Sequence, residues 1–434
     1  MQLIPVSLTE YCDRTLCRIN NHNMKTKITT AILSFALLVV FNFNRLQAQT
    51  PGSIEMGPQY ANEVFYSLTN GEVKSSPRNI WDIAFYTNAF SAGIITNGGA
   101  GVELYTYPNA AADGWNSFDT TGMSGWTKMY NDASEWENGA FNRNQKGHPD
   151  YGWGVYSMTS HDVIGDSLFL IKTPDGIFRK LNIIRKYSTL NQYEIRFSLL
   201  DGQQDQTVTL EVNPQNDRAF MAYSFINGIV DREPAAASWD ILFTRYIASV
   251  QNTPYPVVGV LLNPNVTAAR SEKTDPAFTD WSNLDFETGS DVIGYNWKSL
   301  NGSQYVIEDS LLFFVKAQQG GVYKLVFDSF AGSSTGITTF NTTLLSPLGL
   351  NNPEVVKVFV YPNPATDQLN LVLQGPSFSG KTGLYDLSGR LLRNWELDRT
   401  GSMKLDVSEI NPGTYILQTN NNGTVTTNKV ILVK

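Results

Sequence analysis

WDIAF at residues 81–85 and WDILF at residues 239–243 are nearly the same five letters, 158 positions apart. Farther along the chain, matching residues recur at an offset near 144. Two consistent offsets with a deletion between them predict a duplicated unit, and so long a period indicates two domain-sized halves rather than a solenoid. The other matching pairs are Gly101-Val102 with Gly259-Val260, Leu104 with Leu262, Trp153 with Trp297, Asp166-Ser167 with Asp309-Ser310, and Lys180-Leu181 with Lys324-Leu325.

Apolar residues past position 50 alternate mostly with a period of two. Runs rich in Val, Ile, Phe and Tyr are separated by Asn, Gly, Asp and Pro, which is typical of antiparallel strands that bury one face. We therefore predict an all-β fold of two related antiparallel β halves, at 50–215 and 216–335, and a small C-terminal Ig-like β-sandwich at 358–434. Residues 336–357 are rich in Ser, Thr, Asn and Gly and are predicted to be a linker.

Residues 1–49 form a leader with the pattern of a secretory signal peptide. From Met24, which is a good candidate for the true start, two lysines precede an apolar run from Ala31 to Phe43. Gln47-Ala48-Gln49 then resembles a small-residue cleavage site. The apolar run is shorter than the ~20 residues needed to cross a bilayer, so we expect no transmembrane helix in the mature chain.

Both cysteines of the chain, Cys12 and Cys17, lie in this leader. The mature chain is therefore predicted to have no disulfide, no thiol nucleophile and no cysteine metal ligand. Without the leader, 27 of the 32 basic and 38 of the 40 acidic residues remain, for a net charge of −11. An acidic chain without a basic tract excludes nucleic acid as a partner.

The C-terminal unit carries a series of spaced turn and strand motifs. Pro362 and Pro364 disfavour helix before its first strand, and residues 384–389 form a hairpin turn. The unit resembles the type A C-terminal sorting domain of the type IX secretion system of Bacteroidetes-type bacteria. That resemblance implies the secretion machinery as a partner and a secreted or outer-membrane surface location. It rests chiefly on Tyr361, Pro362, Asn363, Pro364, Gly389, Gly413 and Tyr415.

The duplicated region, roughly 55–340, resembles the HmuY-like haem-binding family. The resemblance lies in strand and turn residues, among them 81–85, 95–99, 166–169 and 243–246. It implies an all-β scaffold that holds haem between loops through two axial side chains, often histidines, and so implies haem or a haemoprotein as a partner in iron acquisition.

Two histidines remain after the leader, His148 and His161, and both lie in the first half. A bis-His haem site needs two neutral imidazoles on opposite faces of the porphyrin and an apolar lining. Met158 is an alternative axial ligand, and no other metal site is expected. The residues available for the lining are Trp136, Tyr151 and Trp153. The alternative interpretation places His148 in a solvated turn and His161 on the polar surface.

Another interpretation needs no haem. The halves differ most between residues 113 and 151, where the first carries a long loop with Trp115, Trp126 and Trp136. Such a loop can bind a glycan or another protein by stacking, or its tryptophans can simply pin it to the sheet. A third alternative is a scaffold with an entirely different ligand.

Enzymatic activity is not expected. The sequence contains no Gly-x-Ser-x-Gly elbow, zinc-ligand spacing, P-loop or dinucleotide fingerprint. Asp82 and Asp240 could act as a carboxylate pair, yet each follows a core tryptophan in its own repeat, which favours a structural role. The prediction is a non-enzymatic binding protein, exported to the surface or released.

Overall fold

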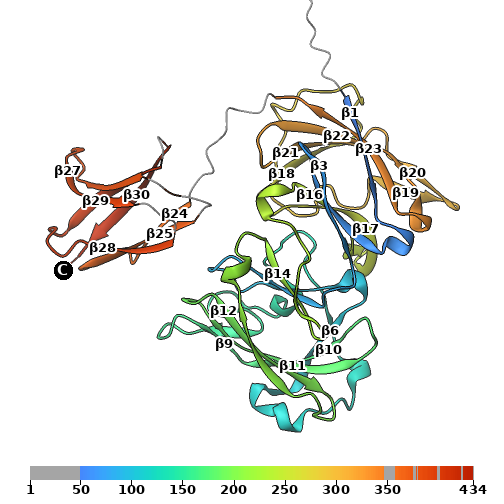
Figure 1. Cartoon of the computed structure of the whole chain (residues 1–434), viewed down its shortest axis with the longest axis horizontal. Helices are drawn as coiled ribbons and strands as arrows, with labels where there is room; N and C mark the ends of the chain where they lie inside the picture. Colours follow the sequence, from blue (N-terminus) through green and yellow to red (C-terminus); the bar gives the residue numbers. More distant parts are fainter. Residues whose placement is uncertain are drawn as a thin grey trace, which may run out of the picture. The chain divides into compact units, whose positions relative to one another are not determined.

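The computed structural model describes residues 49–346, 357–374, 378, 380–397, 401–421 and 424–433 (Figure 1). Within these ranges the chain consists of antiparallel strands and short 3-10 helices, which confirms the all-β prediction. None of the described helices has the length and apolar character that a membrane span requires. The predicted signal peptide, Met24, Cys12 and Cys17 lie outside the described residues.

Two sheets form a first sandwich. One has the strand order β15-β14-β4-β5, and the other has the order β13-β12-β11-β10-β6-β7, with the hairpin β8–β9 attached to β11. The strands are β4 (Ile83–Tyr86), β5 (Ile94–Thr96), β6 (Glu103–Ala111), β7 (Lys128–Met129), β8 (Gly154–Tyr156), β9 (Val163–Gly165), β10 (Ser167–Lys172), β11 (Phe178–Tyr187), β12 (Gln192–Leu199), β13 (Gln206–Glu211), β14 (Phe220–Ser224) and β15 (Gly228–Val230).

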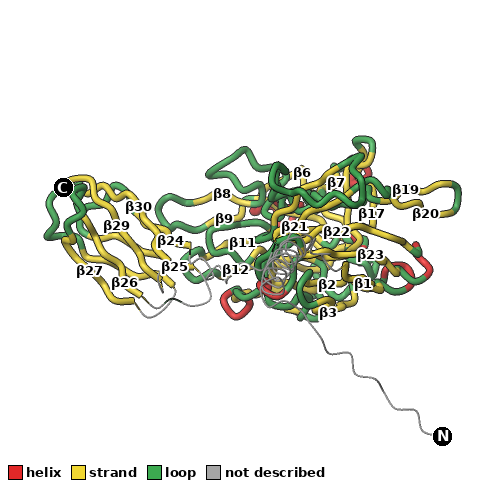
Figure 2. The backbone as a smooth tube through the Cα atoms, turned by 90° about the horizontal axis from the view of Figure 1, so that it is seen from above, coloured by secondary structure: helices red, strands yellow, loops and turns green. Residues whose placement is uncertain are grey.

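A second sandwich repeats this plan, with sheet orders β17-β16-β2-β3 and β1-β23-β22-β21-β18. Its hairpin β19–β20 projects beyond the two sheets (Figures 1 and 2). The strands are β1 (Gln49–Glu55), β2 (Asn62–Ser67), β3 (Gly71–Pro77), β16 (Ile241–Val250), β17 (Thr253–Leu262), β18 (Thr267–Ser271), β19 (Lys298–Asn301), β20 (Gln304–Ile307), β21 (Leu312–Lys316), β22 (Val322–Phe330) and β23 (Ile337–Leu344).

Short 3-10 helices connect these strands: η1 (Pro58–Tyr60), η2 (Gly98–Ala100), η3 (Ala112–Ser117), η4 (Met123–Gly125), η5 (Ala140–Asn142), η6 (Asn213–Gln215), η7 (Ala236–Ser238) and η8 (Gly332–Ser334). The tail has two sheets of its own, β24-β25-β28 and β27-β26-β29-β30. Its strands are β24 (Lys357–Tyr361), β25 (Gln368–Gln374), β26 (Gly380–Tyr385), β27 (Leu391–Leu397), β28 (Gly401–Asp406), β29 (Gly413–Asn421) and β30 (Thr424–Leu432).

Each sandwich contains strands from both halves of the sequence. β1–β3 come first in the chain, yet β2 pairs with β16 and β1 lies next to β23 in the second sandwich. β13–β15 complete the first sandwich, where β14 pairs with β4. The predicted division at residue 215 cuts the chain into two consecutive halves. Each sandwich, however, is built from strands on both sides of that position.

Among the described residues three large apolar cores are accompanied by four smaller apolar clusters. The first joins Phe85 and Ile94 of one sheet to Phe169 and Ile183 of the other. The second sandwich has an equivalent core, and the tail has its own, which includes Leu384 and Leu417. Burying large side chains such as these stabilises each by about 1.5–3 kcal/mol, so each unit has its own source of stability.

The two WD motifs occupy equivalent positions at the start of β4 and β16. The Asp82 carboxylate accepts a hydrogen bond from the backbone N–H of Phe225 (2.8 Å). Asp240 accepts one from Leu68 (2.7 Å) and another from Gln318 (2.8 Å). Each aspartate therefore ties a hairpin from the other half of the sequence to its own strand, and burial raises the pKa of both carboxyls. This geometry supports the structural role expected for both residues.

The alignment of the repeats changes after the WD motifs. Asn97 and Asn263 are equivalent, since the side-chain amide of each donates to the carbonyl of its own WD tryptophan, Trp81 or Trp239. Because β16–β17 is a longer hairpin than β4–β5, the offset grows from 158 to 166 here. The offset then falls to 164 in the next strand, where Leu104 faces Ile171 and is equivalent to Ala268, which faces Val315. Matching Leu104 with Leu262 was wrong.

The predicted linker was also wrong in its first part. Residues Ile337–Leu344 form β23, and Phe340 on this strand is fully buried in the second core. The Ser/Thr/Asn-rich composition misled the prediction because Thr338 and Thr342 are buried on the same face as Phe340. Residues 347–356 of the predicted linker lie outside the described residues.

Replacing Asp240 by alanine should lower the free energy of unfolding by about 2–4 kcal/mol, because two buried backbone N–H groups lose their acceptor. Asp82→Ala should have about half that effect, since Asp82 accepts from one such group. Denaturant titration followed by tryptophan fluorescence measures both. The control is Asp280→Ala in an exposed turn, which should leave stability almost unchanged. Equal losses in all three variants would contradict the assigned role.

Candidate functional site

The Trp-rich loop of the first repeat is packed against the body. Trp115 is buried, and the Lys180 ammonium and the Arg196 guanidinium lie 4.6 and 4.4 Å from its ring. Trp126 packs against Tyr107 and Phe118. These contacts favour the interpretation in which the tryptophans pin the loop, and Trp115 and Trp126 do not form an exposed stacking surface.

Trp136 has a different position, at the junction of the two repeats. Its indole N–H donates to the carbonyl of Leu262 (2.9 Å). Close by in the chain, the carbonyls of Ala133 and Ser134 accept hydrogen bonds from the hydroxyl and N–H of Ser290. The segment that the halves do not share thus binds the first repeat to the second.

A cleft opens at this junction, with a volume of about 690 Å³ that includes the solvent at its mouth. Its apolar walls include Trp81, Trp136 and Leu242. The two repeats approach closely here, since a Cβ at Gly99 would lie 1.7 Å from the carbonyl oxygen of Arg245. Only glycine fits at this position.

One polar group beside the cleft has no internal role. The Tyr246 hydroxyl is buried without a hydrogen-bond partner among the described residues, and burial raises the pKa of Tyr246. Natural structures rarely leave such a group unpaired. By contrast, Asn97 and Asn131 on the cleft wall use their amides to hold backbone groups.

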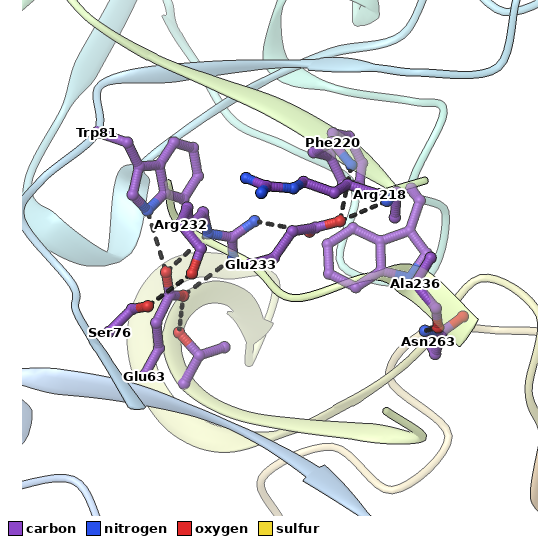
Figure 3. A network of polar contacts seen from close by, with 12 residues as sticks. Glu63, Ser76, Trp81, Arg218, Phe220, Arg232, Glu233, Ala236 and Asn263 are labelled. Atoms are coloured by element: carbon purple, nitrogen blue, oxygen red, sulfur yellow. Dashed lines mark hydrogen bonds and ion pairs between the residues drawn. The ribbon is translucent and has the colours of Figure 1, made fainter. Parts of the chain in front are cut away.

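A buried charge network lies beside the cleft (Figure 3). The Arg232 guanidinium donates to both carboxylate oxygens of Glu63, at 2.7 and 2.9 Å. It also lies 3.7 Å from Glu233 and 4.4 Å from the centre of the Trp81 ring. Glu63 accepts further hydrogen bonds from Trp81 and Thr244. Burial raises the pKa of Glu233 to about 7, although Arg232 and two backbone N–H groups oppose this shift.

The two histidines lie together elsewhere, on the surface near hairpin β8–β9. The Tyr156 hydroxyl hydrogen-bonds to Nδ1 of His161 (2.9 Å). The ring of His148 lies 5.4 Å from that of Tyr156 and 6.4 Å from that of Tyr151. Met158 is 72% exposed in the connecting loop. Tyr156, which was not among the predicted site residues, therefore contacts both histidines.

The other two predicted lining residues do not join the histidines. Trp153 is fully buried, and its N–H donates to the carbonyl of Ala92 (2.9 Å). It cannot line a surface haem site because its ring is part of the first core. Trp136 lies at the repeat junction, where it lines the cleft rather than contacting either histidine. Within the described ranges, no three His, Cys, Asp or Glu side chains gather as a metal-binding group.

The predicted sorting residues shape the ends and turns of the tail. The Asn363 side chain donates to the carbonyl of Lys429 and accepts from the N–H of Ile431, both at 2.8 Å. It therefore holds the segment of Tyr361, Pro362 and Pro364 against β30. The Tyr415 hydroxyl donates to the carbonyl of Asn411 (2.7 Å).

Two glycines serve the turns of the tail. Gly389 has φ +84°, in the turn where the Asp386 carboxylate accepts from the N–H groups of Ser388 and Arg390. A Cβ at Gly413 would lie 3.2 Å from the Tyr415 hydroxyl, so a larger residue there would press on this ring.

Residues 359–434 match the family model of the secretion system C-terminal sorting domain. The tail is a type IX sorting domain. The protein is therefore exported by the type IX machinery and is secreted or attached at the outer-membrane surface, as predicted. This match covers the tail alone and does not characterise the body.

Two solved structures match the chain at low similarity. Dimeric latent PorU from Porphyromonas gingivalis shares 9% identity over 88% of this chain and 34% of that chain, with a TM-score of 0.19. The BSP domain of a biofilm-associated protein shares 10% identity over 89% of this chain and 81% of that chain, with a TM-score of 0.18. The chain thus spans about a third of the length of PorU.

Scores this low establish no shared fold with either structure. No curated protein matches the sequence. The resemblance of the body to HmuY-like proteins gains no support from these matches.

Proposed function

We propose that the protein is a non-enzymatic binding protein of the cell exterior, which takes a small ligand into the cleft between its repeats. The observation that carries this proposal is the Tyr246 hydroxyl, buried beside the cleft without a partner among the described residues. Tyr246 lines the cleft, and a ligand that displaces the side chains over its hydroxyl and offers a hydrogen-bond acceptor there would satisfy the group. Ligand sites typically combine apolar walls with a few such polar groups.

Both carboxylates that line the cleft are already paired with arginines, and this disfavours a cationic ligand. Glu63 is paired with Arg232, and Asp132 is paired with Arg143 at 2.8 Å. Arg245 neighbours Tyr246 on β16, so the two side chains point to opposite faces of the sheet. Trp136 offers an aromatic surface on the wall. A sugar, which combines an apolar face with hydroxyl acceptors, fits this combination, so the end of a glycan is the proposed ligand class.

Tyr246→Phe should weaken sugar binding about tenfold, since one hydrogen bond of about 1.4 kcal/mol is lost. Its stability should stay unchanged or rise slightly, because the hydroxyl has no partner to lose. Calorimetric titration with a panel of monosaccharides and short oligosaccharides measures affinity, and thermal unfolding measures stability. The control is Tyr255→Phe, since Tyr255 is 59% exposed. No binding by any sugar, or equal affinity in all three proteins, would refute this ligand class.

A second candidate function, haem binding, rests on the contact of both histidines with Tyr156. Nδ1 of His161 is engaged by the tyrosine hydroxyl, which leaves Nε2 to bind iron. Hemin titration should then shift the Soret band, and His148→Ala/His161→Ala should abolish that shift. The control is Tyr156→Phe, which removes the hydroxyl and keeps both imidazoles. A shift that persists in the double variant would exclude these histidines as ligands.

A further inference from the structure

The two repeats share more of their length than the WD motifs indicate. β2–β3 and β14–β15 are equivalent hairpins with Tyr66-Ser67 and Tyr223-Ser224 at an offset of 157. The Ser67 hydroxyl accepts from the N–H of Asn70 (3.2 Å), and the Ser224 hydroxyl accepts from that of Asn227 (3.4 Å). Both hairpins continue into a glycine with positive φ, 87° at Gly71 and 74° at Gly228.

The strands before these hairpins are equivalent as well. Ile54 and Met56 of the first repeat correspond to Leu210 and Val212 of the second, and all four are buried. A Pro-Gln pair follows in each, at 58–59 in η1 and at 214–215 in η6. Each repeat therefore begins with a three-stranded arm, and each arm completes the sandwich of the other repeat. We call residues 49–77 the N-terminal arm and residues 206–230 the middle arm.

The two arms meet at Lys74 and Asp231, which occupy equivalent positions in the two repeats. Lys74 and Asp231 are 157 positions apart, the offset of the hairpins, and their side chains form an ion pair at 2.9 Å. The Lys74 ammonium also donates to the carbonyl of Asp231 (2.9 Å). A residue that contacts its own counterpart marks the two-fold axis of an isologous interface. The body thus has the geometry of a symmetric dimer that exchanges arms, joined into one chain.

Charges at this axis favour pairing between unlike repeats. Two first repeats would place Lys74 opposite another lysine, and two second repeats would place Asp231 opposite another aspartate. Glu63, which pairs with Arg232, corresponds to Phe220 in the second repeat, so Arg232 would also lose its partner there. Juxtaposed like charges and unpaired buried charges disfavour these alternatives.

We propose that the N-terminal arm can dock on a second copy of this chain and form an arm-exchanged dimer. The N-terminal arm comes first in the described sequence and is joined to the body only through residues 78–82. Its sheet partners β16 and β23 belong to the second repeat. The same surface on another chain would make the same contacts. Within one chain the short connection at 78–82 gives the arm a high effective concentration, so monomers dominate in dilute solution.

Refolding from denaturant tests this dimer. Protein refolded from about 1 µM to about 1 mM, a range that reaches typical effective concentrations, should show a dimer fraction that rises with concentration. Tyr66 and Ile241 are strand partners between the N-terminal arm and β16. Tyr66→Cys/Ile241→Cys, refolded in reducing buffer and oxidised afterwards, should give covalent dimers on a non-reducing gel from the dimer fraction.

The matched control is Ala84→Cys/Ala222→Cys, which joins the middle arm to β4. The middle arm is tethered at both ends, so this pair should cross-link within single chains in the same dimer. Monomers at every concentration would overturn the proposal. So would a disulfide between positions 66 and 241 that forms only within single chains, and so would covalent dimers from both cysteine pairs. Should the cysteine variants fail to fold, co-refolding and co-purification of two differently tagged unsubstituted chains gives the same readout.

Discussion

Replacing Glu63 by alanine should lower the free energy of unfolding by about 3–5 kcal/mol, because Arg232 is left as a buried charge without its bidentate partner. The side chains of Glu63 and Arg232 are 1% and 4% exposed, so water cannot replace the lost contact. Denaturant titration gives the difference directly. The matched control is Lys74→Ala, which removes the more exposed ion pair close by and should cost less than about 1 kcal/mol.

The loss in Glu63→Ala should depend on pH because Glu233 is the remaining partner of Arg232. Burial raises the pKa of Glu233 to about 7, from 4.5 for the free side chain. The folded protein therefore holds a proton that the unfolded chain releases, and this contribution to stability falls as pH rises from about 4.5 to 7. Near pH 5 Glu233 is neutral and leaves Arg232 unpaired in the variant, whereas near pH 8 it is ionised and pairs with Arg232.

We therefore expect a larger loss at pH 5 than at pH 8. Glu63→Ala/Glu233→Gln should lose this difference, since no titrating partner remains. Equal losses at both pH values in Glu63→Ala would show that Glu233 does not take over the pairing. A loss below about 1 kcal/mol at both values would contradict the buried network itself.

Removing residues 358–434 should abolish delivery to the cell surface and the medium. The truncated protein should remain in the periplasm. The sorting domain provides the export signal, and its core consists of its own residues. The truncated body should still fold because its two main cores contain no tail residue. Cell fractionation with immunoblotting measures the location, and circular dichroism of the purified truncation measures the fold.

A finer test addresses the tail itself. Asn363→Ala removes both hydrogen bonds between the start of the tail and β30 and should reduce the exported fraction. The control is Glu396→Ala, whose exposed side chain pairs with Lys381 alone among the described residues and should export normally. Surface delivery of the truncated chain would show that the tail is dispensable for export.

Sequence patterns predicted local features of this protein well. Period-two alternation predicted an all-β fold because burial on one face of a strand is a local requirement. The motifs around Tyr361, Gly389 and Tyr415 identified the sorting tail, since those turns depend on neighbouring residues. The repeat was visible because both tryptophans of the WD motifs fill equivalent core positions. The prediction from composition was wrong at β23, because the threonines buried on this strand are also typical of a linker sequence.

The strand pattern, the repeat and the export tail could thus be predicted from the order of the residues. The strands that complete each sandwich could be assigned from the three-dimensional fold alone, because an exchanged hairpin buries the same residues as an unexchanged one. The same holds for the candidate site. Trp136 and Trp153 lie 17 positions apart in the chain, yet one reaches the repeat junction and the other the first core, since long-range packing rather than neighbouring residues sets where each ring is buried.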